Sequence, residues 1–282
     1  MENTKEIQHV VWDGDNTIWD WMAYAVPAYE AMCDVISEIS GRSSDDTASA
    51  MKQFYTAAGT LENEGLVQGL QATGFFSHLS DFNLDQTIIR VHTVFSQIRQ
   101  EKLHVYPGIS SVMKEINRRG LEQIVITDAP KRQAQSRLRH SRLGSNISRG
   151  YAMPTAEISD LPAGFGQSSL SESGPPFYDL LHEKPHVDLE AIFQMTRAEV
   201  ARHVAIIGDN DAKDMALARN YGCLGIHARY GATDPDLGRR IARFAPPRVA
   251  SRNMQIDAGL AENSNANIYP VDRPQDILEV LK

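Results

Sequence analysis

The chain has 282 residues, with 28 Lys or Arg against 36 Asp or Glu, so its formal net charge is −8. This acidity argues against a nucleic-acid partner, because proteins that bind nucleic acids neutralise phosphates with a basic surface. Hydrophobic residues make up 42% of the chain and charged residues 23%. This is the composition of a folded globular protein, and it excludes collagen and intrinsic disorder.

Few cysteines and short apolar runs restrict the expected cellular setting. Cys33 and Cys223 are too few for a disulfide framework or a cysteine-based zinc site. No run of about 18 consecutive apolar residues could cross a membrane, and the first residues do not resemble a secretory signal. We therefore expect a cytoplasmic protein with no membrane partner.

The first predicted strand lies close to the N-terminus. Residues 7–12 form an apolar run that ends abruptly at Asp13-Gly14-Asp15. Such a run is typical of a buried strand that leads into a polar loop.

A long helical stretch follows this strand. Between residues 18 and 105 the apolar residues follow helical spacing, and Gly41 ends one of the predicted helices. We predict a helical subdomain at 19–104, inserted into a core domain that is made of 1–18 and 105–282.

Two further apolar runs, 123–126 and 203–207, predict strands that also end in polar residues. Predicted helices at 110–119 and 212–221 accompany them, each followed by glycine. Alternation of buried strands and helices predicts an α/β fold, a three-layer α/β/α Rossmannoid core around a parallel sheet. Ligands of such sheets bind at the carboxyl ends of the strands.

Two further segments of the core have an unusual composition. Residues 145–176 are expected to be an irregular loop, because Gly, Ser and Pro are abundant in their second half. Residues 131–150 contain six basic residues and no acidic one, which favours a solvated helix face over a nucleic-acid surface.

The predicted strand ends carry a group of carboxylates together with a hydroxyl and a lysine. Carboxylates at one sheet edge repel one another unless a cation joins them, and an oxygen-rich group without His or Cys suits Mg²⁺. With a lysine and a hydroxyl beside the metal, the site could hold a phosphoryl group. Six residues make up this predicted site: Asp13, Asp15, Thr127, Lys184, Asp209 and Asp214.

Four motifs in this order resemble those of the haloacid dehalogenase (HAD) superfamily. They are Val10-Val11-Trp12-Asp13-Gly14-Asp15-Asn16-Thr17, Ile126-Thr127, Lys184-Pro185, and Gly208-Asp209-Asn210-Asp211-Ala212-Lys213-Asp214. The resemblance covers 7–17 and 105–226, and it implies that the helical insert is a C1 cap, which in relatives closes over the site and selects the substrate.

The resemblance also implies the chemical roles of the two aspartates in the first motif. Asp13 would be the nucleophile that forms an aspartyl-phosphate. Asp15 would protonate the leaving group and then activate water. Relatives that cleave carbon–halogen bonds lack an acidic residue at the second position, so Asp15 favours a phosphatase over a dehalogenase.

The remaining roles follow from the same resemblance. Thr127, Lys184 and the backbone N–H groups of Gly14 and Asp128 would bind the phosphate. A Mg²⁺ ion would be held by four residues, with Asp15 contributing its backbone carbonyl: Asp13, Asp15, Asp209 and Asp214. The expected substrate is a small phosphorylated metabolite.

Two other functions remain open at this point. The same site would serve a phosphotransferase or phosphomutase if a bound hydroxyl replaced water. A phospho-acceptor signalling domain also combines Asp, Thr and Lys at strand ends. Its phosphorylated aspartate follows a later strand, however, and no helical insert of this size follows its first strand.

The negative charge is concentrated in the insert. Between residues 20 and 105 there are eleven acidic and five basic residues. We expect the insert to dock against the basic stretch 131–150. Net charge cannot attract an anionic substrate here, so that attraction must come from Mg²⁺, Lys184 and loop amides.

Overall fold

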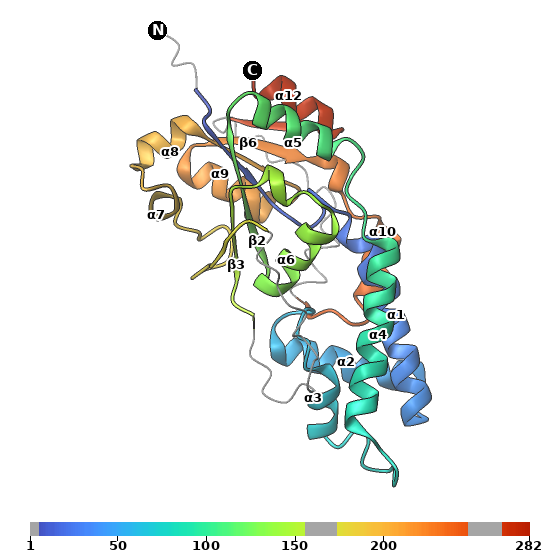
Figure 1. Cartoon of the computed structure of the whole chain (residues 1–282). Helices are drawn as coiled ribbons and strands as arrows, with labels where there is room; N and C mark the ends of the chain where they lie inside the picture. The colour runs from blue at the N-terminus through green and yellow to red at the C-terminus, as the bar shows by residue number, and fades with distance from the viewer. Residues whose placement is uncertain (1–5, 156–173, 248–266) are drawn as a thin grey trace.

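The protein is built around a seven-stranded parallel sheet, shown in a computed structural model that describes residues 6–155, 174–247 and 267–282 (Figure 1). The spatial order of the strands is β4-β3-β2-β1-β5-β6-β7, so the first strand of the chain is central. The strands are β1 (His9–Trp12), β2 (Glu122–Pro130), β3 (Arg149–Met153), β4 (Phe177–Asp179), β5 (Val204–Gly208), β6 (Leu224–Ala228) and β7 (Ile268–Val271).

Successive residues of β1 face opposite sides of the sheet, and each side is covered by helices. Val10 and Trp12 pack in one apolar cluster with α5 (Ile109–Arg118), whereas Val11 packs in a second cluster with α8 (Arg197–His203) and α9 (Ala216–Tyr221). The alternation follows from the period of two in a strand. The predicted three-layer α/β/α fold is thus confirmed.

Shorter elements complete the core. The other α-helices of the core, within the described residues, are α6 (Lys131–His140), α7 (Leu189–Phe193), α10 (Pro235–Ile241) and α12 (Ile277–Val280). Three 3₁₀ turns and one π-helical turn connect them: Gly144–Asn146, Arg229–Gly231, Pro274–Asp276 and, in π geometry, Asp211–Met215.

The segment between β1 and α5 forms four helices, which we call the cap. They are α1 (Trp21–Ser40), α2 (Ser44–Ala58), α3 (Leu66–Ala72) and α4 (Leu84–Lys102), and they gather at one end of the molecule (Figure 1). Asp20 caps the first turn of α1 through Ala23 N–H at 3.0 Å, and Gly41 ends the helix with φ +66°. Only glycine adopts such a φ without strain.

The two connections between cap and core run side by side. The N–H of Asp20 donates to the carbonyl of His104 at 3.0 Å, and the N–H of Tyr106 donates to the carbonyl of Ile18 at 3.0 Å. The cap boundaries at 19 and 104 remain a prediction.

Two details of the predicted core differ from the structure. The expected loop 145–176 contains strand β3, which pairs with β2 in parallel; residues 156–173 of that loop lie outside the described residues. The helix predicted from residue 212 begins instead as the π turn and becomes α-helical at Ala216.

Among the described residues, no helix combines the length and apolar character that crossing a membrane requires.

Candidate active site

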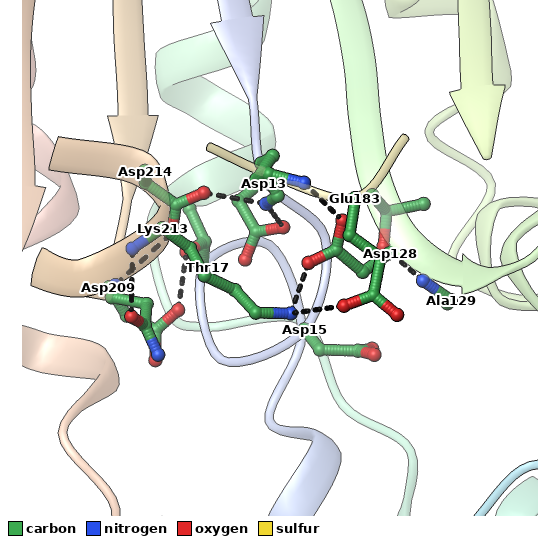
Figure 2. A network of polar contacts seen from close by, with 12 residues as sticks. Asp13, Asp15, Thr17, Asp128, Ala129, Glu183, Asp209, Lys213 and Asp214 are labelled. Atoms are coloured by element: carbon green, nitrogen blue, oxygen red, sulfur yellow. Dashed lines mark hydrogen bonds and ion pairs between the residues drawn. The ribbon is translucent and has the colours of Figure 1, made fainter. Parts of the chain in front are cut away.

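Five of the six predicted side chains lie close together at the carboxyl ends of the central strands. They are Asp13, Thr127, Lys184, Asp209 and Asp214. Asp13 follows β1, and its N–H donates to the carbonyl of Ile207 in β5 at 2.8 Å. Asp209 follows β5 directly, and Thr127 lies near the end of β2. Figure 2 shows Asp13 at the centre of these polar contacts, with Asp209 and Asp214 on one side.

Lys184 connects two of the carboxylates from below the surface. Its Nζ donates to Oδ1 of Asp13 and to Oδ1 of Asp214, the latter at 2.5 Å, and its side chain is buried. Burial alone would lower the pKa of Lys184, but the carboxylates of Asp13, Asp214 and Asp128 raise it well above its usual range. The ammonium is therefore a fixed positive charge under the nucleophile candidate.

The π turn after β5 gives Asp214 its position. The N–H of Asn210 donates to Oδ2 of Asp214 at 3.1 Å, while Oδ1 of Asn210 accepts from the N–H of Lys213 at 3.1 Å. Gly208 is required beside it, because a Cβ there would lie 2.2 Å from Cγ of Asp214. Asn210 thus caps the turn, and Asp211 pairs with Arg219 at the surface.

Asp13, Asp209 and Asp214 form an acidic group that could hold a cation. One carboxylate oxygen from each lies within 4.8 Å of the others. Burial, together with Asp13 and Asp214, raises the pKa of Asp209 well above its usual range, and burial together with Asp13 raises the pKa of Asp214 to about 7. A divalent cation would remove this repulsion, and the hard oxygen donors fit Mg²⁺.

These shifts predict the pH dependence of stability in metal-free protein. Unfolding returns the Asp214 carboxyl to an ordinary pKa of 3.8, so the folded chain holds an extra proton between about pH 4 and 7. The free energy of unfolding should therefore fall as pH rises through this window, by up to about 1.4 kcal/mol per pH unit. Saturating Mg²⁺ should flatten the decline, because it favours the ionised carboxylates.

Urea unfolding between pH 5 and 7, in EDTA and in Mg²⁺, measures this effect. Asp214→Asn is the matched control, since it lacks this carboxyl but keeps Asp209, whose pKa is also raised. A wild-type protein whose stability follows the same pH slope as Asp214→Asn in EDTA would contradict the prediction.

Of the four predicted phosphate-binding residues, Thr127, Asp128 and Lys184 line a pocket over the site. Oγ1 of Thr127 accepts from the N–H of Ala129 at 3.2 Å. Gly14 lies close to Thr127, because a Cβ on Gly14 would be 3.4 Å from that Oγ1. The carboxylate of Asp128 is engaged by the N–H of Lys184 at 3.0 Å and by Nζ of Lys213. The role of the Asp128 backbone N–H stays a prediction.

Asp15 is separate from the acidic group. Its carboxylate accepts from Nε1 of Trp19 at 2.6 Å and from Nη1 of Arg137 at 3.0 and 2.9 Å. Figure 2 shows its side chain outside the network of dashed contacts and extending away from Asp209. Burial raises the pKa of Asp15, and Arg137 opposes that rise. Any metal contact of Asp15 would come from its backbone, as the family resemblance implies.

Arg137 contacts the predicted site residue Asp15, a contact that the sequence pattern does not predict. The basic stretch was expected to be a solvated face, but the Arg137 side chain is fully buried with 0% exposed. It pairs with Asp15 and with Glu62 of the cap. Helical spacing gave one signal, since Arg137 shares the buried face of α6 with Ala134 and Leu138.

The expected docking of the acidic cap on the basic stretch is confirmed. Glu62 pairs with Arg137, and Glu64 pairs with Arg132 at 2.8 Å. Core arginines near α10 add further pairs to cap acids: Arg240 with Glu30 at 2.6 Å and Arg243 with Asp45 at 3.3 Å.

A pocket of about 460 Å³ lies over the site, between the core and the cap. The core contributes the six predicted residues to its lining, and the cap contributes Trp21 and the segment 58–63. A second cavity of about 470 Å³, between the cap and α6, shares only Leu61, Glu62 and Asn63 with it. The cap segment at 61–63 thus borders both spaces.

Comparisons with known proteins agree with this fold. A sequence model of the haloacid dehalogenase-like hydrolases matches residues 7–222. A HAD phosphatase from Thermococcus onnurineus has a similar structure, with a TM-score of 0.53, 14% identity and 98% of each chain covered. A haloacid dehalogenase-like hydrolase from Xanthomonas campestris has a TM-score of 0.54 and 14% identity, over 98% of this chain and 96% of that chain. No curated protein matches the sequence significantly.

Proposed function

Because the chain belongs to the haloacid dehalogenase-like hydrolase family, we propose that it hydrolyses a small phosphorylated metabolite through an aspartyl-phosphate on Asp13. The main support is the setting of Asp13, whose carboxylate contacts Lys184 and shares an acidic group with Asp209 and Asp214. A carboxylate nucleophile can attack a phosphate only where nearby cations reduce their mutual repulsion. The fold shared with the Thermococcus phosphatase adds support.

The first half-reaction uses both Asp13 and Asp15. An Oδ of Asp13 attacks phosphorus, the bond from phosphorus to the leaving oxygen breaks, and Asp15 gives that oxygen a proton. Lys184 would orient the Asp13 carboxylate and neutralise charge on the phosphoryl group. The Thr127 hydroxyl and the N–H groups of Gly14 and Asp128 would donate to the phosphoryl oxygens.

The second half-reaction regenerates the nucleophile. Asp15, now ionised, removes a proton from water, the water oxygen attacks phosphorus, and the bond between phosphorus and the Asp13 carboxylate breaks. Inorganic phosphate leaves. Residues of the cap that line the pocket would limit the entry of bulk water during transfer.

We propose that Asp13, Asp209, Asp214 and the Asp15 backbone carbonyl hold Mg²⁺. When bound, the ion neutralises charge on the phosphoryl oxygens and so favours attack by an anionic nucleophile. We also propose a cytoplasmic location, since Cys33 and Cys223 are buried and are not joined in a disulfide.

A hydrolysis screen over phosphorylated metabolites, with Mg²⁺ and with EDTA, tests the proposed function. The expected result is release of inorganic phosphate that requires the metal. Formation of a new organic phosphate in place of free phosphate would identify a phosphotransferase or phosphomutase instead. Absence of both products across sugar, glycerol, nucleoside and aryl phosphates would overturn the proposal.

The role of Asp15 predicts a dependence on the leaving group. Asp15→Asn should lower kcat/KM for phenyl phosphate by about 10²-fold or more, because phenoxide is a basic leaving group that needs a proton. The ratio kcat/KM is compared because it does not include hydrolysis of the aspartyl-phosphate, a step that both esters share. The loss should be smaller for p-nitrophenyl phosphate, whose leaving group departs as the anion. Steady-state kinetics with both esters measures the ratio, and equal losses for the two esters would contradict the acid role.

A further inference from the structure

Arg137 stands out because its charge is buried completely and each of its three nitrogen atoms lies against a polar or anionic side chain. Its side chain has 0% exposure at the inner face of α6. A buried guanidinium is strongly destabilising unless anionic and polar partners surround it. Its contacts therefore indicate what this part of the fold is built to hold.

The contacts of Arg137 join one core loop to two cap segments. Nη1 donates to both oxygens of Asp15, at 3.0 and 2.9 Å. Nε donates to the hydroxyl of Tyr24 in α1 at 2.9 Å. Nη2 forms an ion pair with Oε1 of Glu62, between α2 and α3. The guanidinium is thus fixed by the cap and fixes the carboxylate of Asp15 in turn.

Indole N–H groups complete the same arrangement. Nε1 of Trp19 donates to Oδ1 of Asp15 at 2.6 Å, and Nε1 of Trp21 donates to Oε1 of Glu62 at 3.3 Å. Asp15 and Glu62 both line the 460 Å³ pocket, whereas Arg137 is not part of its lining. Arg137 therefore lies behind the pocket wall, between the carboxylates of Asp15 and Glu62, and its positive charge offsets their mutual repulsion.

We propose that Arg137 is a positioning residue, which orients the Asp15 carboxylate toward the leaving oxygen. Tyr24 and Glu62 of the cap hold the Arg137 guanidinium in place for this task. The inference rests on the proposed function, since it concerns the acid of that reaction. A planar fork is needed for this task, because a lysine ammonium cannot hold two Asp15 oxygens, Glu62 and Tyr24 at once. Misplacing an acid by about 1 Å can cost 10²-fold in rate.

The test compares phenyl phosphate with p-nitrophenyl phosphate in the full-length protein with Mg²⁺. Arg137→Gln should lower kcat/KM for phenyl phosphate by about 10²-fold, with a smaller loss of kcat/KM for the nitrophenyl ester. Arg137→Lys keeps the buried charge and should fold. Its loss of activity should again be larger for phenyl phosphate than for the nitrophenyl ester, but smaller than that of Arg137→Gln. In the Asp15→Asn background, Arg137→Lys should have no further effect on the leaving-group ratio.

Two matched variants complete the design. Tyr24→Phe removes only the acceptor of Nε and should shift the ratio in the same direction, by about fivefold. Arg132→Gln breaks a different ion pair between core and cap and should leave the ratio unchanged. Wild-type protein that releases no phosphate from either ester would overturn the proposed function and this inference together. Wild-type turnover with equal losses for both esters in Arg137→Lys, or with additive losses in the double variant, would overturn this inference alone.

Discussion

Asp13→Asn is expected to lower kcat for p-nitrophenyl phosphate by about 10³-fold or more, while the protein stays folded. The amide oxygen is a poor nucleophile and cannot form the acyl-phosphate bond. Folding should persist, because the substitution removes one of three clustered carboxylates and leaves Lys184 paired with Asp214 at 2.5 Å. Phosphate release and thermal unfolding measure the two outcomes separately.

Asp211→Asn is the matched control for this variant. Asp211 begins the π turn that carries Asp214, but it is exposed and pairs with Arg219 at the surface. Its substitution should leave activity within about twofold of wild type, as expected for an exposed pair of small energetic value. The intact mass of Asp13→Asn must be checked before assay, because an Asn-Gly sequence deamidates back to Asp. Full activity in verified Asp13→Asn protein would contradict the mechanism.

Lys184→Met is expected to affect both activity and stability. The substitution preserves most of the side-chain volume but leaves Asp13 and Asp214 buried without their shared cation. Removing one partner from a buried ion pair costs about 3–5 kcal/mol. Hydrolysis should fall by about 10²–10³-fold, as for loss of a charge that stabilises the transition state. Urea unfolding and steady-state kinetics measure the two losses.

Adding Mg²⁺ shows whether Lys184→Met loses stability through electrostatic repulsion or through a packing defect. If repulsion among carboxylates destabilises Lys184→Met, Mg²⁺ should restore more stability to this variant than to wild type. Lys131→Met is the control, since Lys131 pairs with Asp179 at 2.6 Å near the surface and should change stability by less than about 1 kcal/mol. Equal effects of Lys184→Met and Lys131→Met would contradict the buried role of Lys184.

The sequence predicts the core because its signals are local. The apolar run at 7–12 becomes β1 at the centre of the sheet, and Asp13 and Asp209 follow two strands that pair in parallel. Neighbouring parallel strands place their carboxyl ends at one edge, so the meeting of these residues follows from topology. The glycine stops at Gly41 and Gly222 also match the structure.

Other features depend on contacts between distant segments and have no local signal. Strand β3 reads Arg-Gly-Tyr-Ala-Met, which lacks the apolar run of a buried strand and forms through pairing with β2. Arg137 resembles a surface residue of a basic helix until Glu62 and Asp15 are placed beside it. Burial of a charged side chain is set by its partners in space, and these lie 75 and 122 positions away in the chain.

Transient phosphorylation of Asp13 is the central claim, and acid-quench peptide mapping tests it most directly. Protein is mixed with p-nitrophenyl phosphate and Mg²⁺, quenched in acid during turnover, digested and analysed by mass spectrometry. We predict one phosphoryl group on Asp13, with a larger amount in Asp15→Asn, where water activation is slowed, and none in Asp13→Asn. A phosphoryl group on another residue, or continued turnover by Asp15→Asn without any phosphorylated peptide, would contradict the mechanism.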